Sequence, residues 1–579
     1  MTDVLIEKNV GATMRDGTVL RADVYRPADD GRYPVLIQRT PYNKEMWPLT
    51  AVTLDPVRAA GAGFVVIVQD VRARWASDGE RFAPYSNEAT DGYDSVQWAS
   101  ALPGANGRVG AYGVSYAGAT AWHAAAEAPP ALCALSPTTA PNDFFADHLW
   151  RGGAFLLGTL AMWTLQAIGP NAVVRAQGGS PGFVPSLVRL VDDIDGFDRW
   201  TWHRPLKTFP PARPEEPSLL PFFFEILDHS QRDDYTRARS VSERHDGMRA
   251  PALILAGWHD LLLAADLQHY RALRETGATE AAREGTRLVI GPWSHGMFLN
   301  VVGEVDFGFR SSGFLLDLRE DLTTMQLRWF GHWLGETSQA DPRGPDGPRV
   351  RLFVQGVDRW SDEDDWPPAG VVDRRLHLRA DGGLSFEPPE DGEPPGAYVY
   401  DPERPCPTRG GSILMPRHHP AGPVDQTPLL GRRDVLCFTS APLDGDLQVI
   451  GHVRAVLHAA TTAPDTDWVV KLCRVDTRGR TLNVCDGILR ASYRRSPNER
   501  QPVEPGAVER YEVDLWATAI VFRPGERLRV LVTSSDFPRY DRNPNTGELG
   551  VEATESVPAL QRIFHDAQHP SHVVLPVRD

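Results

Sequence analysis

The sequence lacks the features that mark membrane, secreted and disulfide-rich proteins. No window approaches the ~18 uninterrupted apolar residues that a transmembrane helix requires. The opening segment MTDVLIEKNVGATMRDG has no basic stretch followed by an apolar run, so we expect no signal peptide. The five cysteines are odd in number and form no CxxC pair, which is typical of reduced structural thiols. We therefore expect a cytoplasmic protein that does not associate with a membrane.

Positive charge is scarce relative to negative charge. The 60 lysines and arginines are outnumbered by 76 aspartates and glutamates, which gives a formal net charge of −16. An acidic surface repels phosphate groups, so neither nucleic acid nor an anionic membrane is an expected partner. The 42% of hydrophobic residues is ordinary for a globular protein, and 579 residues are too many for one hydrophobic core.

The pattern of apolar runs divides the chain into an α/β part and an inserted segment. Short runs rich in Val and Ile, separated by helix-length spacers, indicate buried parallel strands at 34–38, 64–68, 252–256 and 287–290. We assign 1–141 and 250–347 to the two halves of this α/β core. The intervening residues 142–249 are expected to form a helical cap, with helices over 148–169 and 186–197. A further amphipathic helix is expected near the end of the second half, with one apolar face made by Leu318, Leu322, Met325, Trp329 and Trp333.

Residues 348–579 change to many short strands without helical spacers. The segments 467–475 and 510–518 alternate between apolar and polar residues, and so does 527–535, where Leu528, Val530 and Val532 would share one face. This pattern predicts a β-sandwich.

Two serines compete as a nucleophile on a strand–turn–helix elbow. The literal G-x-S-x-G match surrounds Ser180, but Pro181 follows it and has no backbone N–H to donate to an oxyanion. Ser115 lies between a predicted strand at 108–112 and an Ala-rich predicted helix at 116–127, and Tyr116 supplies the N–H. We predict that Ser115 is the nucleophile, although an ordinary serine in a turn is the alternative from this segment alone.

The acid and the base are expected after later strands, in the order Ser, Asp, His. Asp260 follows the apolar run at 252–256, and His295 follows the run at 287–290. His295 would accept the proton of the serine, and Asp260 would hold the imidazole and stabilise its cation. His259 is a rival base, but it precedes the last strand of the core, so packing is the better interpretation.

Two sets of residues resemble metal sites. His123 and Glu127 could share a helix face, but an ion pair or core packing is the better interpretation of both. Asp541, Asn543, Asn545 and Glu552 have EF-hand offsets, but Thr546 stands at the glycine position and no helices flank the segment, so a turn is expected. We expect no metal and no other cofactor.

The sequence resembles the cocaine esterase-like branch of the X-Pro dipeptidyl-peptidase (S15) hydrolases over nearly its whole length. The matching motifs are TPYNK at 40–44, DGYDSVQW at 91–98, GRVGAYGVSYAG at 107–118, GWHD at 257–260, GPWSH at 291–295 and SSDFPRYDRNPNTG at 534–547. The resemblance implies an α/β-hydrolase core, a helical cap and a C-terminal jelly roll. It also implies the triad Ser115, Asp260 and His295, with an oxyanion hole made by the Tyr116 N–H and the Tyr42 hydroxyl. Residues matching the acyl pocket of such esterases are Trp150, Trp163 and Leu262.

Two departures from the family pattern bear on specificity. The common Arg-Gly-Arg-Gly is replaced by Arg72-Ala73-Arg74-Trp75, which makes that loop bulkier. Relatives that cleave α-amino acid esters carry acids just after the aspartate, whereas Leu261, Leu262 and Leu263 stand here, which argues against recognition of a free α-amine.

Together these observations predict a serine carboxylesterase that cleaves esters with an apolar or aromatic acyl group through an acyl-enzyme. An amide hydrolase with the same triad, either an acylase or an X-Pro dipeptidyl-peptidase, is the alternative. A more remote one is an inactive homologue that binds ligands through its β-domain. The expected partner is a small-molecule ester or amide. A homodimer is possible, and the sequence leaves both the oligomeric state and the natural substrate open.

Overall fold

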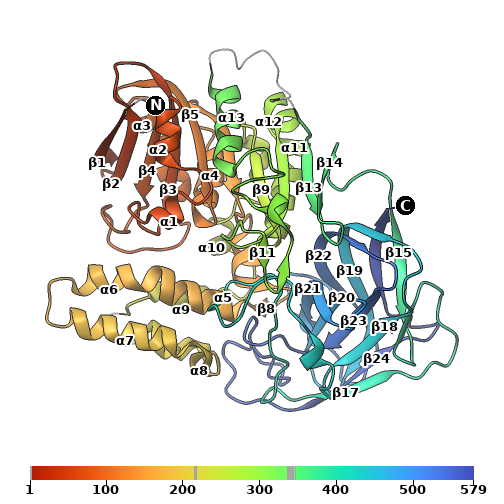
Figure 1. Ribbon diagram of the computed structural model, residues 1–579. Coiled ribbons are helices and arrows are strands. Elements are labelled where there is room, and N and C mark those ends of the chain that lie inside the picture. Colours follow the sequence, from red (N-terminus) through yellow and green to blue (C-terminus); the bar gives the residue numbers. More distant parts are fainter. Residues whose placement is uncertain (1–2, 214–217, 336–343, 346, 579) are drawn as a thin grey trace.

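The computed structural model describes residues 3–213, 218–335, 344–345 and 347–578. Its N-terminal part is built on one ten-stranded sheet (Figure 1). In spatial order the strands are β1 (Val4–Thr13), β2 (Val19–Pro27), β4 (Val65–Asp70), β3 (Tyr33–Thr40), β5 (Ala105–Val114), β6 (Leu132–Thr138), β9 (Leu253–His259), β10 (Arg287–Ser294), β13 (Val350–Val354) and β14 (Arg359–Glu363). The neighbouring strands from β4 to β13 pair in parallel. The pairs β1–β2, β2–β4 and β13–β14 at the two edges are antiparallel.

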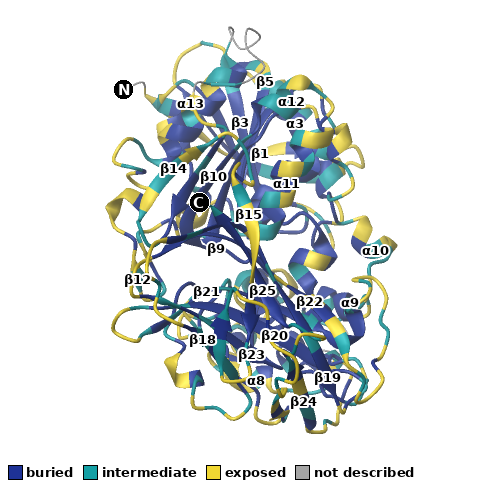
Figure 2. Ribbon diagram, turned by 90° about the vertical axis from the view of Figure 1, so that its right-hand side faces the viewer, coloured by how far each residue is buried: buried dark blue, intermediate teal, exposed yellow. Residues whose placement is uncertain are grey.

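Helices cover both faces of this sheet because alternate strand residues point to opposite sides. Val35 and Ile37 pack into the cluster formed with α3 (Glu88–Ser100), α4 (Tyr116–Ala126) and α11 (Leu263–Thr276), whereas Leu36 belongs to the cluster on the other face. That second cluster is formed with α2 (Pro56–Gly61) and α13 (Leu322–Leu334). Figure 2 shows the sheet strands buried between partly exposed helices. The α/β-hydrolase core predicted from the sequence is therefore confirmed.

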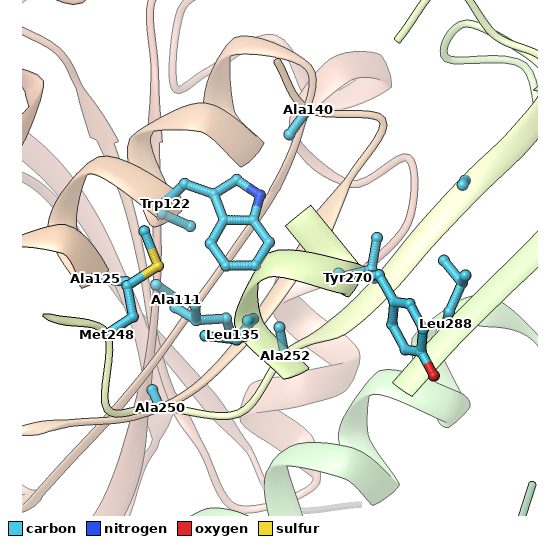
Figure 3. Close-up of a cluster of buried hydrophobic side chains, with 14 of the residues drawn as sticks. Ala111, Trp122, Ala125, Leu135, Ala140, Met248, Ala250, Ala252, Tyr270 and Leu288 are labelled. Atoms are coloured by element: carbon cyan, nitrogen blue, oxygen red, sulfur yellow. The ribbon is translucent and has the colours of Figure 1, made fainter. Parts of the chain in front are cut away.

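The first face is centred on a tryptophan from the helix that follows Ser115. Trp122 is fully buried beside Ala125 and Ala140, with Met248 below it (Figure 3). Its ring stacks on His269 at a centroid distance of 4.1 Å. The Ala-rich sequence of α4 leaves room for this one large ring, so the helix lies close to the sheet.

The apolar face expected near the end of the core is correct except at its first residue. Leu322, Met325, Trp329 and Trp333 are buried on α13. Leu318 lies before the helix with a φ of 60° and is exposed. The helix begins only after Asp321, whose side chain accepts a hydrogen bond from the Thr324 N–H and caps the first turn.

The cap lies between β6 and β9 and is largely helical. Its elements are η1 (Phe144–Leu149), β7 (Trp150–Arg151), β8 (Ala154–Phe155), α5 (Leu157–Met162), η2 (Trp163–Ile168), α6 (Gly169–Gln177), α7 (Phe183–Asp195), α8 (Phe197–Thr201), α9 (Pro221–Leu227) and α10 (Asp234–Arg237). The expected single helix over 148–169 is wrong at its start. Gly152 and Gly153 adopt φ values of 52° and 82° and turn the chain into the hairpin β7–β8 before α5 begins. The helix expected at 186–197 is present as α7.

The C-terminal part is the expected all-β jelly roll, drawn in blue in Figure 1. Its strands are β15 (Val371–Leu378), β16 (Gly383–Ser385), β17 (Gly396–Tyr400), β18 (Leu436–Ser440), β19 (Leu447–Thr461), β20 (Asp467–Val475), β21 (Thr481–Arg490), β22 (Glu509–Phe522), β23 (Arg527–Thr533), β24 (Ala559–Phe564) and β25 (His572–Arg578). Leu528, Val530 and Val532 all point into its core, as their alternation predicts.

The core sheet continues past the boundary expected at 347/348. β13 pairs with β10 in parallel, and β14 pairs with β13, so residues up to Glu363 extend the α/β sheet. Gln355 then exchanges backbone hydrogen bonds with Ala519 and Val521 of the jelly roll. The proposed division into parts stays a prediction, but the chain crosses from one sheet to the other here. Among the described residues, no helix combines the length and the apolar character needed to cross a membrane.

Candidate active site

Ser115 occupies the sharp turn between β5 and α4. Its backbone has φ 59° and ψ −123°, a strained conformation that non-glycine residues rarely adopt. The Ser115 N–H donates to the Thr138 carbonyl at 2.9 Å, which ties the turn to the neighbouring strand β6. The strain is held by this pairing and by the helix that follows, and the hydroxyl is presented at the carboxyl edge of the sheet.

Small residues around the turn are a steric requirement. A Cβ atom on Gly113 would lie 2.6 Å from the Ala117 Cβ, and one on Gly118 would lie 2.9 Å from the Ala140 Cβ. Gly113 also has a φ of 152°. The strand and the helix therefore approach as closely as the sequence predicted from its small residues.

His295 and Asp260 meet Ser115 at this edge. The His295 Nε2 lies 2.9 Å from the Ser115 Oγ, and its Nδ1 lies 3.0 Å and 3.1 Å from the two carboxylate oxygens of Asp260. Asp260 is fully buried, and its Oδ1 also accepts the Leu262 N–H at 2.8 Å. The three side chains form one continuous chain of hydrogen bonds, although they come from three separate strand ends.

The Tyr42 hydroxyl and the Tyr116 N–H converge beside the serine. Tyr42 follows β3, and its hydroxyl has hydrogen-bond contacts with the Ser115 hydroxyl and with the Tyr116 N–H. The Tyr116 N–H belongs to the first residue of α4, so it has no partner within the helix. Burial raises the pKa of Tyr42 above its usual value of 10.0, and these hydrogen bonds oppose the rise only in part. Tyr42 therefore keeps its proton at neutral pH and can act as a donor.

Trp163 donates a hydrogen bond to the same tyrosine. Its indole Nε1 lies 3.1 Å from the Tyr42 hydroxyl oxygen, which leaves the tyrosine O–H free to donate elsewhere. The indole stacks on the Tyr116 ring at 6.4 Å, and Phe222 contacts it edge-on at 5.8 Å. Phe82 lies 6.5 Å from it. The sequence predicted Trp163 as a pocket residue but gave no sign of this polar contact.

The other two predicted pocket residues lie in different surroundings. Trp150 is buried with Trp163 in one large apolar cluster, and its Nε1 donates to the His229 carbonyl at 3.1 Å. Leu262 lies in a separate small cluster that includes Leu414 from the loop between β17 and β18. Trp150 and Trp163 therefore lie in one cluster, whereas Leu262 lies beside Asp260.

The bulky loop at 72–75 holds the backbone directly before Tyr42. Arg74 and Trp75 both donate to the Pro41 carbonyl, at 2.9 Å and 3.0 Å. The same buried guanidinium donates to the carbonyls of Ala167 and Ile168 in the cap. No sequence spacing indicates this bridge, because it joins three distant segments through backbone carbonyls.

His148 is a further residue that the sequence analysis missed. It lies on η1, and its ring contacts Trp163 edge-on at 5.4 Å and Tyr85 at 5.8 Å. Burial, together with a smaller contribution from the nearby His295, lowers the pKa of His148 to about 4. His148 is therefore a neutral imidazole in the aromatic lining of the cap.

The residues that were rejected as nucleophile, base or metal ligands make no hydrogen bond to Ser115, Asp260 or His295 among the described contacts. Ser180 is exposed between α6 and α7 in the cap. The His259 Nε2 lies 2.9 Å from the Gln355 Oε1, and burial lowers the pKa of His259 to about 4. His123 stacks on Tyr85, whereas Glu127 forms an ion pair with Arg244.

The segment with EF-hand offsets is part of a buried polar network. The Asp541 carboxylate accepts hydrogen bonds from Arg490 at 2.9 Å and from the Phe155 N–H at 2.8 Å. Asn543 donates to Asp467 at 2.9 Å, and Asp467 also pairs with Arg490. These side chains join the jelly roll to the cap hairpin.

Comparison with known proteins agrees with this geometry. Residues 16–297 match the X-Pro dipeptidyl-peptidase (S15) family, and residues 345–574 match the C-terminal non-catalytic domain of X-Pro dipeptidyl-peptidases. A cocaine esterase from Rhodococcus sp. (strain MB1 Bresler) is 34% identical over 591 residues, which cover 99% of this chain and 98% of the esterase. The chain belongs to the S15 family. Named esterases among its relatives and the S15 match identify it as a serine hydrolase.

Two solved structures of other enzymes share the whole architecture. An α-amino acid ester hydrolase has a TM-score of 0.82, and an aminopeptidase from a marine sediment Thaumarchaeota archaeon has a TM-score of 0.80. Each is 25% identical, and each alignment covers 100% of this chain and 97% of the other. The core, the cap and the jelly roll are therefore common to proteins named for different substrates.

Gly113→Ala tests whether the close approach at the elbow is required. The variant should be less stable than the parent and should label poorly with a fluorophosphonate, because the new Cβ overlaps Ala117. Gly107→Ala is the matched control, since Gly107 also lies on β5 with a φ of 90° but has no atom within 4 Å of its added Cβ. The control should cost only the backbone strain, about 1–3 kcal/mol. Equal melting temperatures for the two variants would contradict the steric argument.

Proposed function

We propose that this S15 hydrolase cleaves carboxylic esters of small molecules through an acyl-enzyme on Ser115. The observation that carries the proposal is the chain of hydrogen bonds from Ser115 through His295 to Asp260. His295 takes the serine proton as Oγ attacks the ester carbonyl, and it then delivers that proton to the leaving alkoxide. Water, activated by the same imidazole, releases the acid and restores the serine.

Two hydrogen-bond donors would stabilise the tetrahedral intermediate. The Tyr116 N–H and the Tyr42 O–H lie beside the serine hydroxyl, where the oxyanion forms. The Trp163 N–H donates to the Tyr42 oxygen, which polarises the phenol and strengthens its O–H as a donor. In this proposal Asp260 holds the imidazole with Nδ1–H towards the carboxylate and stabilises the imidazolium during attack.

The acyl group is proposed to be apolar or aromatic. Trp163, Phe82 and Phe222 form an aromatic wall next to Tyr42, and Trp150 extends the same cluster. Phe82 and Phe222 also line a cleft of about 610 Å³ between the cap and the 73–82 loop, whose lining does not include Ser115 or Trp163. Leu262 closes the wall on the side of the triad in this proposal.

We favour cleavage of an ester. The alternative is cleavage of an amide in a substrate that carries a free amine. The relative named cocaine esterase supports an ester substrate. Leu261, Leu262 and Leu263 are buried after Asp260, and none of them can hold an ammonium group. The S15 match keeps an acylase or X-Pro dipeptidyl-peptidase as the second candidate.

Ser115→Ala should abolish the reaction while the protein stays folded. We expect a loss on the order of 10⁶ in kcat, since triad members act as a unit. Ser180→Ala should keep full activity, because Ser180 is an exposed residue of the cap. Fluorophosphonate labelling with circular dichroism checks both variants. Labelling of the Ser115→Ala protein, or an unlabelled but folded parent, would refute the assignment.

Tyr42→Phe should mainly lower kcat, because the lost hydroxyl serves the transition state. Removal of one oxyanion donor costs about 2.7–4 kcal/mol in the barrier, or roughly 10²–10³-fold. Trp163→Phe should cost less, about 0.5–1.5 kcal/mol or roughly 2- to 13-fold, because only a hydrogen bond to the donor is lost. Tyr398→Phe, in the jelly roll, is the control and should leave kcat unchanged. A normal kcat in the Tyr42→Phe variant would show that the hydroxyl of Tyr42 is not an oxyanion donor.

A matched set of substrates tests the proposed specificity. The nitrophenyl ester of 3-phenylpropanoic acid should have a higher kcat/KM than the same ester of phenylalanine, because the buried leucines offer no partner for the α-amine. An X-Pro nitroanilide should be cleaved more slowly than either ester. Faster turnover of the anilide would favour the peptidase alternative instead.

A further inference from the structure

A cluster of ligand-type side chains lies far from the triad in sequence and joins two parts of the fold. The carboxylate of Asp198 lies 3.0 Å from the Nε2 of His418 through one oxygen and 3.0 Å from the Nε2 of His419 through the other. Among the described residues, this is the one group of three whose ligand atoms all lie within 4.8 Å of one another. Two imidazoles and one carboxylate therefore converge on a single point.

The three residues come from opposite sides of an interdomain contact. Asp198 is on α8 of the cap, whereas His418 and His419 are in the loop that precedes the jelly-roll strand β18. The ring of His419 also contacts Phe197 at 6.4 Å. A neighbouring cleft of about 240 Å³ is lined by residues of both sides, among them Phe197 of the cap and Pro416 and Arg417 of the loop.

We propose that Asp198, His418 and His419 bind one Zn²⁺ ion that fastens the cap to the jelly roll. Two imidazole nitrogens and one carboxylate oxygen are a donor set that Zn²⁺ accepts, with water as the fourth ligand. Each imidazole would carry its proton on Nδ1 and offer the Nε2 lone pair to the metal. The ion replaces the hydrogen bonds that both nitrogens now make to the carboxylate.

The side chains have the freedom needed to reach tetrahedral spacing. Ligand atoms about 2.1 Å from zinc lie about 3.4 Å apart, slightly more than the present 3.0 Å contacts. The side chains of Asp198 and His418 are 60% and 55% exposed, so rotation about their χ angles is not blocked by packing. His419 is 17% exposed and provides the fixed point of the site.

The chain contains a matched pair without the third ligand. His452 forms a salt-bridge contact with Asp514 at 2.7 Å, and their side chains are 54% and 58% exposed, close to the values for His418 and Asp198. This pair lies on the jelly-roll strands β19 and β22. Because two ligands hold zinc far more weakly than three, His452 provides the control for nonspecific histidine binding.

The first test is zinc titration of the untagged full-length chain by isothermal calorimetry. We expect one equivalent to bind in the parent and in His452→Ala. Because loss of a partner that only orients a ligand weakens metal affinity about 10–100-fold, His418→Ala, His419→Ala and Asp198→Asn should each weaken zinc binding at least tenfold. Parent protein that binds no zinc, or variants that bind as the parent does, would overturn the proposal.

The second test asks whether zinc that is bound by these three residues stabilises the folded protein. Zinc should raise the Tm of the parent and of His452→Ala, because a ligand that binds only the folded state stabilises it by mass action. The three site variants should show no such rise, while their Tm without metal stays near that of the parent. Cobalt in place of zinc should give tetrahedral absorption bands that the site variants lose. A rise in Tm of the same size in the three site variants would mean an adventitious ion only and would overturn the proposal.

Discussion

The proposed reaction centre depends on the register of parallel strands. β9 and β10 pair His259 with Ser294, so the next residue of each strand, Asp260 and His295, leaves the sheet beside the other. A slip of one residue would turn every side chain of a strand to the opposite face and separate the carboxylate from the imidazole. The turn at Ser115 is tied to the same frame, because its N–H binds the end of β6, which lies next to β9. The geometry of the triad is thus a property of the whole sheet, and no single loop creates it.

The position of Tyr42, the proposed oxyanion donor, depends in addition on the cap. Tyr42 is held at its backbone end, where Arg74 and Trp75 share the Pro41 carbonyl, and at its hydroxyl, where Trp163 donates. Arg74 also binds the end of the helical segment that begins with Trp163. A movement of that segment therefore shifts the phenol at both ends. In the proposed reaction, contacts to the acyl group and stabilisation of the oxyanion are coupled through one piece of the cap.

The sequence predicts the core and the meeting of Ser115, Asp260 and His295 well because both leave local patterns. Apolar runs followed by Asp260 or His295 indicate strand ends, and small residues around Ser115 indicate a tight turn. The cap is harder to predict, since an apolar run such as 148–157 is compatible with a helix until Gly152 adopts positive φ and makes a hairpin. The bond from Trp163 to Tyr42 could not be found either, because it joins residues 121 positions apart through tertiary packing alone.

The jelly roll, which matches a domain described as non-catalytic, still reaches the acidic end of the triad. Arg151 of the cap hairpin donates to the Leu261 carbonyl at 2.9 Å, directly after Asp260, and its guanidinium lies 3.9 Å from the Trp516 ring of the jelly roll. The Arg151 side chain is largely buried, and this burial lowers its pKa. A buried cation needs such partners, since an uncompensated buried charge is strongly destabilising. Without Trp516 the arginine would lose its cation–π partner, and the support of the loop behind Asp260 would be weaker. Through Trp516 and Arg151, the β-domain therefore helps to fix the loop that follows Asp260.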